Sequence, residues 1–171
     1  MVNTKKDLEK YLLFEKKKYF PNSKKYIKSF IFGNASEKNI IWKYQKRLRK
    51  LEYHLNNNHS IRKILYKYLL QKIGNKYGLH IPPNVFGIGL KIMHLGPILV
   101  NKNSKIGNNC SIHTNTSIVA HGIEDSAPTI GDNCVIGAGA VVNKNFKNNV
   151  TIAGVPASII STNTSKNWRK E

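Results

Sequence analysis

The sequence contains few cysteines, few acidic residues and no long apolar run. Only 2 of its 171 residues are cysteine, too few for a disulfide framework or a cysteine-rich metal site. No apolar stretch approaches the about 20 residues that a membrane-spanning helix needs. The N-terminus also lacks the apolar core of a signal peptide. We therefore expect a cytoplasmic protein with one domain, or a domain and a smaller appended region.

The few acidic residues leave the first half of the chain strongly basic. Residues 1–78 hold 20 Lys and Arg against 5 Asp and Glu, whereas residues 79–171 hold 8 against 4. Such an asymmetry suggests an anionic partner, which could be nucleic acid, anionic lipid or a phosphate-bearing substrate. A general bias toward Lys, Asn and Ile would produce the same excess, so charge alone does not choose among these explanations.

The first 78 residues have the pattern of about three helices. The first is expected over residues 4–19, where Thr4 and Asp7 resemble a capping box. The second is expected to begin after Ser36 and to end at residues 56–59. Its apolar positions recur at spacings of three and four, which predicts one buried seam. The seam consists of Ile41, Tyr44, Leu48, Leu51 and Leu55.

A third helix is expected from Ser60, as the N-cap, to Gly78, which is a favourable residue for ending a helix. It has a wide apolar face. This face consists of Ile61, Ile64, Leu65, Tyr68, Leu69 and Ile73. Basic helices with interleaved tyrosines can bind nucleic acid. A charge run of this kind is more often the solvated face of a packed helix, so nucleic acid is not the expected partner.

The segment from Phe86 to Val142 repeats every six residues. A large apolar residue opens each hexad, and a small residue follows four positions later. The large residues are Phe86, Ile92, Ile98, Val100, Ile106, Ile112, Ile118, Ile130, Ile136 and Val142, and the small ones are Ser104, Cys110, Thr116, Cys134 and Ala140. A period of six fits neither a helix nor an alternating strand. It predicts short strands joined by turns, each hexad forming one wall of a coil.

The hexads also assign roles to their smaller residues. Both cysteines occupy the small inward-facing position, so we interpret Cys110 and Cys134 as reduced packing residues. Gly and Asn cluster where the turns require left-handed backbone. Residues 119–129 interrupt the pattern with a polar loop, which is a natural place for a binding site. Residues 152–160 have the pattern of a last strand and an exit turn.

These motifs resemble the hexapeptide-repeat acyltransferases. The matching segments are 77–83, 87–101, 127–133, 136–142 and 153–157, of which Met93-His-Leu-Gly-Pro-Ile-Leu-Val100 is the most specific. The resemblance covers roughly three-quarters of the chain. Within the family the chain looks most like the serine O-acetyltransferase-like branch, and there like the O-acetyltransferases of capsular and exopolysaccharide synthesis.

The resemblance implies a mainly β fold, with a left-handed parallel β-helix over residues 79–160. About three basic α-helices would precede it over residues 1–78, and residues 161–171 would form a flexible tail. It also implies a homotrimer with active clefts between the columns. We expect the helices to pack at the N-terminal end of the coils and to face anionic membrane or lipid-linked phosphate, at the inner face of the membrane.

The activity implied is transfer of an acetyl group from acetyl-CoA, as co-substrate, to a sugar hydroxyl of a polysaccharide or its precursor. His94 is the candidate general base, because imidazole titrates near neutral pH. His80 is a candidate for orienting it. The residues expected to meet coenzyme A are Gly137, Ala138, Gly139, Ala140, Gly154 and Pro156. Those expected to contact the acceptor are His113, Asn115, His121 and Asp125.

The sequence departs from the serine acetyltransferase pattern at several positions. Met93 stands where those enzymes have Asp, and Ser126 and Ala127 stand where they have an Arg-His pair. The charged contacts to a serine ammonium and carboxylate are therefore missing. Ser158 replaces a basic residue that meets coenzyme A phosphate. The run from residue 130 to residue 160 is about one coil shorter than the family pattern.

Two alternatives stay open at this point. One is serine O-acetyltransferase. The other is a non-catalytic module that trimerises through its coils and binds nucleic acid or membrane through its basic helices. Three histidines could suggest zinc, but His94, His113 and His121 are 19 and 8 positions apart, which does not match the close-spaced ligand pair that such sites use. We therefore expect no metal.

Overall fold

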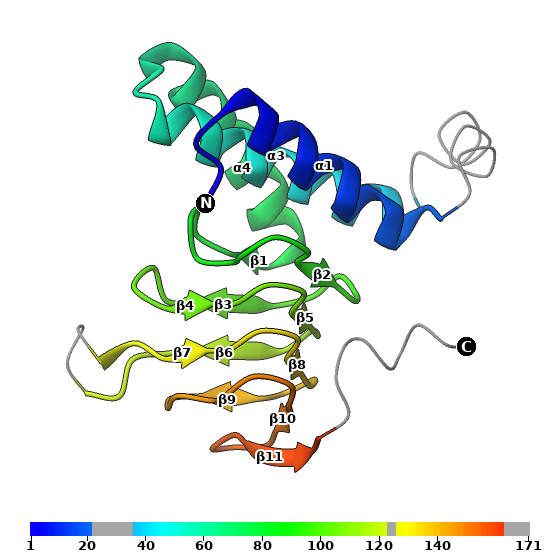
Figure 1. Ribbon diagram of the computed structural model, residues 1–171, viewed down its shortest axis with the longest axis vertical. Helices are drawn as coiled ribbons and strands as arrows, with labels where there is room; N and C mark the ends of the chain where they lie inside the picture. Colours follow the sequence, from blue (N-terminus) through cyan, green and yellow to red (C-terminus); the bar gives the residue numbers. More distant parts are fainter. Residues whose placement is uncertain (22–35, 123–125, 163–171) are drawn as a thin grey trace.

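The computed structural model describes residues 1–21, 36–122 and 126–162 of the chain. Three helices lie at one end of a column of short strands, and the C-terminal strands lie at the other end (Figure 1). The helices are α1 (Lys5–Tyr19), α3 (Glu37–Asn56) and α4 (Ser60–Tyr77). In these parts of the chain, no helix is both long and apolar enough to cross a membrane. The predicted order, basic helices followed by parallel coils, is confirmed.

The first two helices form much as their sequences predict. The Thr4 hydroxyl accepts a hydrogen bond from the Asp7 N–H at 3.0 Å, and the Asp7 carboxylate accepts one from the Thr4 N–H at 2.9 Å. This is the predicted capping box. In α3 the predicted seam faces the core, with Leu55 only half-buried at its end. Its buried members are Ile41, Tyr44, Leu48 and Leu51.

Helix α4 differs from the prediction in its first residue and in its buried side. His59, not Ser60, occupies the N-cap position, whereas Gly78 ends the helix in left-handed conformation with φ of 74°, as predicted. The buried side carries Leu70, Ile73 and Gly74. A Cβ on Gly74 would lie 2.6 Å from the Leu79 carbonyl oxygen. The helix therefore packs through its small residue, and most of the predicted apolar face remains exposed.

The column has three faces of parallel strands. One face contains β1 (Leu79–His80), β3 (Ile98–Val100), β6 (Thr116–Ile118) and β9 (Val141–Val142). The second contains β2 (Lys91–Ile92), β5 (Ser111–Ile112), β8 (Val135–Ile136), β10 (Thr151–Ala153) and β11 (Ser158–Ser161). The third contains β4 (Lys105–Ile106) and β7 (Thr129–Ile130). Only β11 pairs antiparallel within the described residues, and it closes the column after the predicted last strand and exit turn.

The hexad pattern correctly predicts the interior of the column. The large residues that open the hexads are all at most 4% exposed, and the small residues at the second position are at most 2% exposed. Ile92, Ile112, Ile136 and Ile152 stack in register across four neighbouring strands. Cys110 and Cys134 are free thiols in this core, as predicted. The fold is a parallel β-solenoid that buries one stack of side chains per face.

Gly and Asn have different roles at the corners of the coils. Asn109 and Asn133 adopt left-handed backbone, with φ of 57° and 58°. Gly107 and Gly131 do not. Each of these glycines lies instead against the next coil, where a Cβ on Gly107 would lie 2.7 Å from the Asp132 backbone nitrogen. At this corner Asn provides the turn conformation, and Gly permits the close stacking of successive coils. In other turns glycine itself is left-handed, as at Gly89 and Gly139.

A buried charged cluster attaches the helices to the first coil. Arg49 of α3 is wholly buried and lies 2.8 Å from Glu15 of α1 and 2.9 Å from Glu52. Its guanidinium also donates to the carbonyl oxygens of Phe86 and Gly87, at 3.0 and 2.7 Å. Because each charge has a partner, the cluster avoids the penalty of an isolated buried ion. It fixes both helices against the coil that leads into β2.

A second set of buried contacts joins the helices to β2, the strand that precedes His94. The Tyr19 hydroxyl accepts a hydrogen bond from the Ile92 N–H at 2.9 Å and donates to the Gln45 side chain at 2.7 Å. Gln45 in turn donates to the Leu90 carbonyl oxygen at 2.9 Å. Helices α1 and α3 therefore hold β2 on both sides of Lys91. The next turn of the chain carries His94.

Candidate active site

His94 lies in the turn between β2 and β3, with 59% of its side chain exposed. The turns of successive coils stack below it, because the N–H groups of Met93, His113 and Gly137 each donate to the strand one coil further along. We name this edge of the column the His94 corner. It consists of residues 93–96, 113–115, 137–139 and 153–156.

Glu37, the first residue of α3, contacts the His94 turn directly. One carboxylate oxygen accepts a hydrogen bond from the Leu95 N–H at 2.8 Å, and the other lies 3.3 Å from Nδ1 of His94. The Leu95 N–H lowers the pKa of Glu37, and the His94 side chain lowers it further. Glu37 is therefore ionised at neutral pH. A carboxylate only accepts hydrogen bonds, so it selects the tautomer with a proton on Nδ1 and leaves Nε2 as the basic nitrogen.

His113 lies one coil below, with its ring centre 6.5 Å from that of His94. Burial lowers the pKa of His113, and the nearby positive groups His94 and Lys91 lower it further. The neutral imidazole is therefore favoured at neutral pH. In that form it can donate one hydrogen bond and accept another without opposing a positive charge on His94.

The turn that carries His94 is positioned by Gly96. This glycine has φ of 139°, and a Cβ there would lie 2.0 Å from the Thr114 hydroxyl oxygen. No other residue could occupy the position without moving the turn. The contact sets the height of His94 above His113, and Asn115 continues the lower turn in left-handed conformation with an exposed side chain.

The predicted coenzyme A residues lie at the lower part of the same corner. A Cβ on Gly137 would lie 3.0 Å from that of Ala153, so glycine allows the two turns to stack. Ala138 and Gly139 are exposed, and nothing lies within 4 Å of a Cβ added to Gly139. Gly154 and Pro156 are also exposed, in the turn after β10. These residues leave an open backbone surface below the two histidines.

One predicted cofactor residue does not fit this placement. Ala140 is wholly buried and fills the small position inside the coil. Its methyl group therefore packs in the core and cannot contact a ligand at the surface. The Gly-Ala-Gly-Ala run does not form one surface, because the hexad register turns its last member inward.

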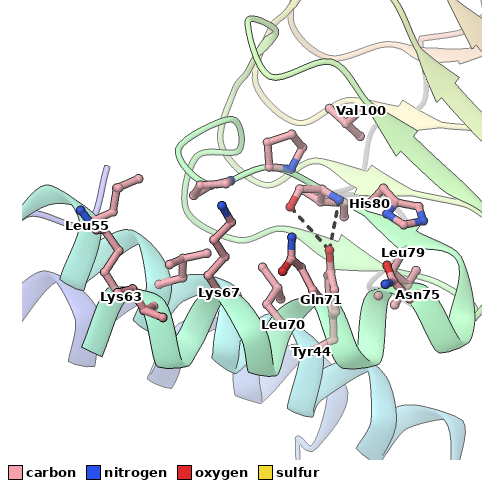
Figure 2. A pocket seen from close by; sticks show the side chains of 16 residues that line it. Tyr44, Leu55, Lys63, Lys67, Leu70, Gln71, Asn75, Leu79, His80 and Val100 are labelled. Atoms are coloured by element: carbon pink, nitrogen blue, oxygen red, sulfur yellow. Dashed lines mark hydrogen bonds between the residues drawn. The ribbon is translucent and has the colours of Figure 1, made fainter. Parts of the chain in front are cut away.

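Two other predicted residues, His80 and His121, make no hydrogen bond to His94 within the described residues. His80, on β1, lines a groove with residues of α3 and α4 (Figure 2), and its Cα pairs with Leu99 of β3. The group next to Nδ1 of His94 is the carboxylate of Glu37, a residue that no sequence motif indicates. His121 lies in the loop between β6 and β7, which is a different corner of the column (Figure 1). Asp125 lies outside the described residues.

The loop at that second corner holds Ser126 and Ala127, which stand where serine acetyltransferases have charged residues. The Ser126 hydroxyl donates to the His121 carbonyl oxygen at 2.7 Å. Within the chain these residues therefore belong to the loop corner and not to the His94 corner. Among the described residues, no cluster of three or more His, Cys, Asp or Glu side chains could hold a metal ion.

Comparisons with known proteins agree with this architecture. No model of a known protein family matches the chain. Over 129 residues it is 30% identical to the serine acetyltransferase of Buchnera aphidicola, which is 63% of this chain and 47% of that relative. Over 50 residues it is 46% identical to the galactoside O-acetyltransferase of Escherichia coli K12, which is 29% of this chain and 25% of the relative. The chain thus spans less than half the length of either relative.

Solved structures give the class of fold. The crystal structure of serine acetyltransferase from Brucella abortus strain S19 matches with a TM-score of 0.66 at 20% identity, over 94% of this chain and 72% of that chain. Its complex with coenzyme A matches with a TM-score of 0.65 at 20% identity, over 93% and 70%. The chain has the hexapeptide-repeat acetyltransferase fold, in its serine acetyltransferase-like form.

Proposed function

We propose that the protein is an acetyl-CoA-dependent O-acetyltransferase with His94 as its general base. The observation that carries this proposal is the contact between Glu37 and His94, on a fold whose named relatives are acetyltransferases. An exposed imidazole with an ionised carboxylate at Nδ1 has a basic Nε2 directed away from its partner. This is the arrangement that a hydroxyl acceptor requires.

The proposed reaction is a direct transfer. Nε2 of His94 takes the proton of the acceptor hydroxyl while its oxygen attacks the thioester carbonyl carbon of acetyl-CoA. The tetrahedral intermediate then collapses, the carbon–sulfur bond breaks, and the coenzyme A thiolate is protonated by the imidazolium. Backbone N–H groups near the cleft would stabilise the oxyanion. An acyl-enzyme on cysteine is disfavoured, because Cys110 and Cys134 are both buried.

Coenzyme A would run along the lower part of the His94 corner. Gly137, Ala138 and Gly139 give it an open backbone, and the turn at Gly154 and Pro156 continues that surface. The coenzyme A complex of the Brucella enzyme, which has the same fold, supports coenzyme A as a ligand of this fold. The short C-terminal part of the column and Ser158 provide a shorter groove and one positive charge fewer than the family pattern.

The active unit would be a homotrimer. In one protomer the His94 corner and the loop with His121 occupy different corners of the column, so both can join one cleft only across two columns. A neighbouring column would bring its loop, and with it His121 and Asp125, to the acceptor side of His94. The exposure of His94 in one protomer is consistent with a cleft completed in this way.

A sugar hydroxyl of a polysaccharide or its precursor is the acceptor we favour. Met93 is apolar, and Ser126 and Ala127 provide no charge, so the usual partners of a serine ammonium and carboxylate are missing. Neutral histidines such as His113 suit sugar hydroxyls, which both donate and accept hydrogen bonds. The short match to galactoside O-acetyltransferase points the same way.

Serine is the second candidate acceptor. Two of the curated relatives and several of the matching solved structures are named serine acetyltransferases. Two charges lie next to the His94 corner, the carboxylate of Glu37 at Nδ1 of His94 and the ammonium of Lys91 near His113, and such charges favour a zwitterionic acceptor. This arrangement keeps serine as a real competitor to the sugar.

Release of the coenzyme A thiol from acetyl-CoA tests the proposal. We expect acceptor-dependent release with a panel of hexoses, acetylated amino sugars and sugar oligomers, and at most weak release with serine. Release with serine at a rate comparable to the best sugar would identify a serine acetyltransferase instead. Coils that trimerise and bind neither acetyl-CoA nor any acceptor would establish the non-catalytic alternative.

A further inference from the structure

The outer face of α4 is apolar and exposed. Ile61 is 84% exposed, Ile64 68%, Leu65 50% and Tyr68 60%. Their spacing of i, i+3, i+4 and i+7 places them on one side of the helix. Leu70, Ile73 and Gly74 lie on the opposite side, against the rest of the protein. The helix therefore has two apolar sides, and the fold covers only one.

The charges on α4 all have the same sign. The helix carries Arg62, Lys63, Lys67, Lys72 and Lys76, and it contains no Asp or Glu. Arg62 and Lys67 are exposed beside the apolar face, and Lys72 follows Tyr68 by one turn on the same side. An exposed apolar face beside basic residues offers the two kinds of group, apolar and cationic, through which a helix binds the interface of an anionic membrane.

A groove extends this apolar surface. Ile64 belongs to both the exposed face and a groove of about 660 Å³ between α4, α3 and the segment after β1. Figure 2 shows Lys67 extending from α4 along this groove, next to Leu70. The groove is lined mainly by Leu51, Leu55, Leu70, Leu79, Pro82 and Pro83, with Lys63 and Lys67 beside them. Lipid chains can fill such a surface, and anionic headgroups can pair with its lysines.

We propose that α4 docks the protein on an anionic lipid bilayer. A symmetric contact between two α4 helices is disfavoured, because it would bring two exclusively positive surfaces together. A bilayer with anionic headgroups supplies both missing partners, an apolar layer for the side chains of Ile61, Leu65 and Tyr68 and negative charge for the flanking basic residues. Docking would hold the helical end of the column at the membrane.

Sedimentation with vesicles tests the docking. The full-length protein should bind vesicles of phosphatidylcholine and phosphatidylglycerol, and bind pure phosphatidylcholine far more weakly. Raising the salt concentration should weaken the binding, because the charges are screened. Each basic residue near an anionic surface contributes about fivefold, so the double variant Lys63→Gln and Lys67→Gln should bind about 30-fold more weakly.

The apolar contribution is tested by the double variant Ile61→Ser and Leu65→Ser, which should bind at least about tenfold more weakly. The matched control is Leu13→Ser with Lys17→Glu on α1, where both side chains are also exposed. The control should bind as the wild type does. Melting curves confirm that each variant is folded.

Three outcomes would overturn the proposal. The first is failure of the wild type to bind anionic vesicles at low salt. The second is binding that the α4 variants leave unchanged. The third is a fall in molar mass for the Ile61 and Leu65 variant by light scattering without any loss of vesicle binding, which would make the face an interface between copies of the chain. None of these readouts depends on the acetyltransferase activity.

Discussion

Glu37 binds the turn of His94 at two points, through the Leu95 N–H at 2.8 Å and Nδ1 of His94 at 3.3 Å. In the sequence, His94 and Leu95 come 57 and 58 positions after Glu37. The contact joins the first turn of α3 to the first full coil of the column. The helical region is therefore part of the candidate active site as well as a cap on the coils.

Replacing Glu37 by Gln should lower the rate roughly 10- to 100-fold. This is less than the roughly 10⁴-fold cost of losing a buried orienting carboxylate, because Glu37 is exposed and water can partly replace it. Steady-state kinetics measure the change in kcat. Lys38→Gln is the matched control at the neighbouring exposed position, and equal effects in the two variants would exclude a positioning role.

His113→Ala and His121→Ala should chiefly raise the KM for the acceptor. We place both residues beside the acceptor and neither at the proton that His94 removes. The His121 effect requires the loop of a neighbouring column, so it should accompany a trimeric mass in light scattering. A monomeric, fully active protein would contradict the shared cleft. So would a fall in kcat in both variants with KM unchanged.

His113 should also make folding stability depend on pH. Its pKa is lowered in the folded state, mainly by burial. The unfolded chain therefore binds the proton at a higher pH than the folded chain does. Stability is lost as the pH falls below the ordinary histidine value of 6.5 and is regained as the pH rises. Denaturant unfolding at a series of pH values should show that His113→Gln loses less stability at low pH than the wild type does. Identical slopes for wild type and variant would contradict this reasoning.

Arg49→Ala should lower the free energy of unfolding by about 3–5 kcal/mol. The variant would leave the carboxylates of Glu15 and Glu52 buried without their partner, and it would remove two bonds to the first coil. Urea unfolding measures the change. Lys43→Ala on the exposed side of α3 should change the unfolding free energy by less than about 0.5 kcal/mol. Similar values for the two variants would show that the buried cluster is energetically unimportant.

The fold was predictable because its pattern is local and repeated. Each hexad contains its inward-facing residue and its small residue within six positions, and neighbouring hexads repeat this pattern. The hexad pattern therefore correctly predicts that the core contains Ile92, Ile112 and Ile136. The Thr4 capping box and the Gly78 helix end were equally local. Each depends on backbone conformation within one turn.

The buried side of α4 was not predictable in the same way. The sequence of α4 has two apolar sides, and its pattern favours burial of the more continuous one. Packing instead selected the side of Gly74, because only a glycine lets the helix lie against the Leu79 carbonyl. Which side of α4 is buried depends on its contact with another element. The periodicity of the helix sequence carries no information about that contact.

The site was predictable only in part, for a related reason. Met93, His113 and Gly137 each follow the inward residue of a hexad, and His94 comes directly after Met93. Register alone therefore predicts that His94 and His113 lie at one edge. Glu37 has no such register, since it comes from another element and follows an ordinary N-cap serine. A signal was present in principle: an acidic residue at a helix start in a chain with very few of them. The sequence gives no reason to pair it with His94.

The turnover of His94→Ala tests the central claim most directly. The reaction needs a base because a hydroxyl is a weak nucleophile until its proton is removed, and a positioned base contributes about 10²- to 10⁴-fold. With a sugar identified as an acceptor by thiol release, the variant should lose activity by that factor. Its melting curve, trimeric mass and coenzyme A binding should stay close to those of the wild type. A folded variant that retains most of the wild-type rate would contradict the assignment of His94 as the base.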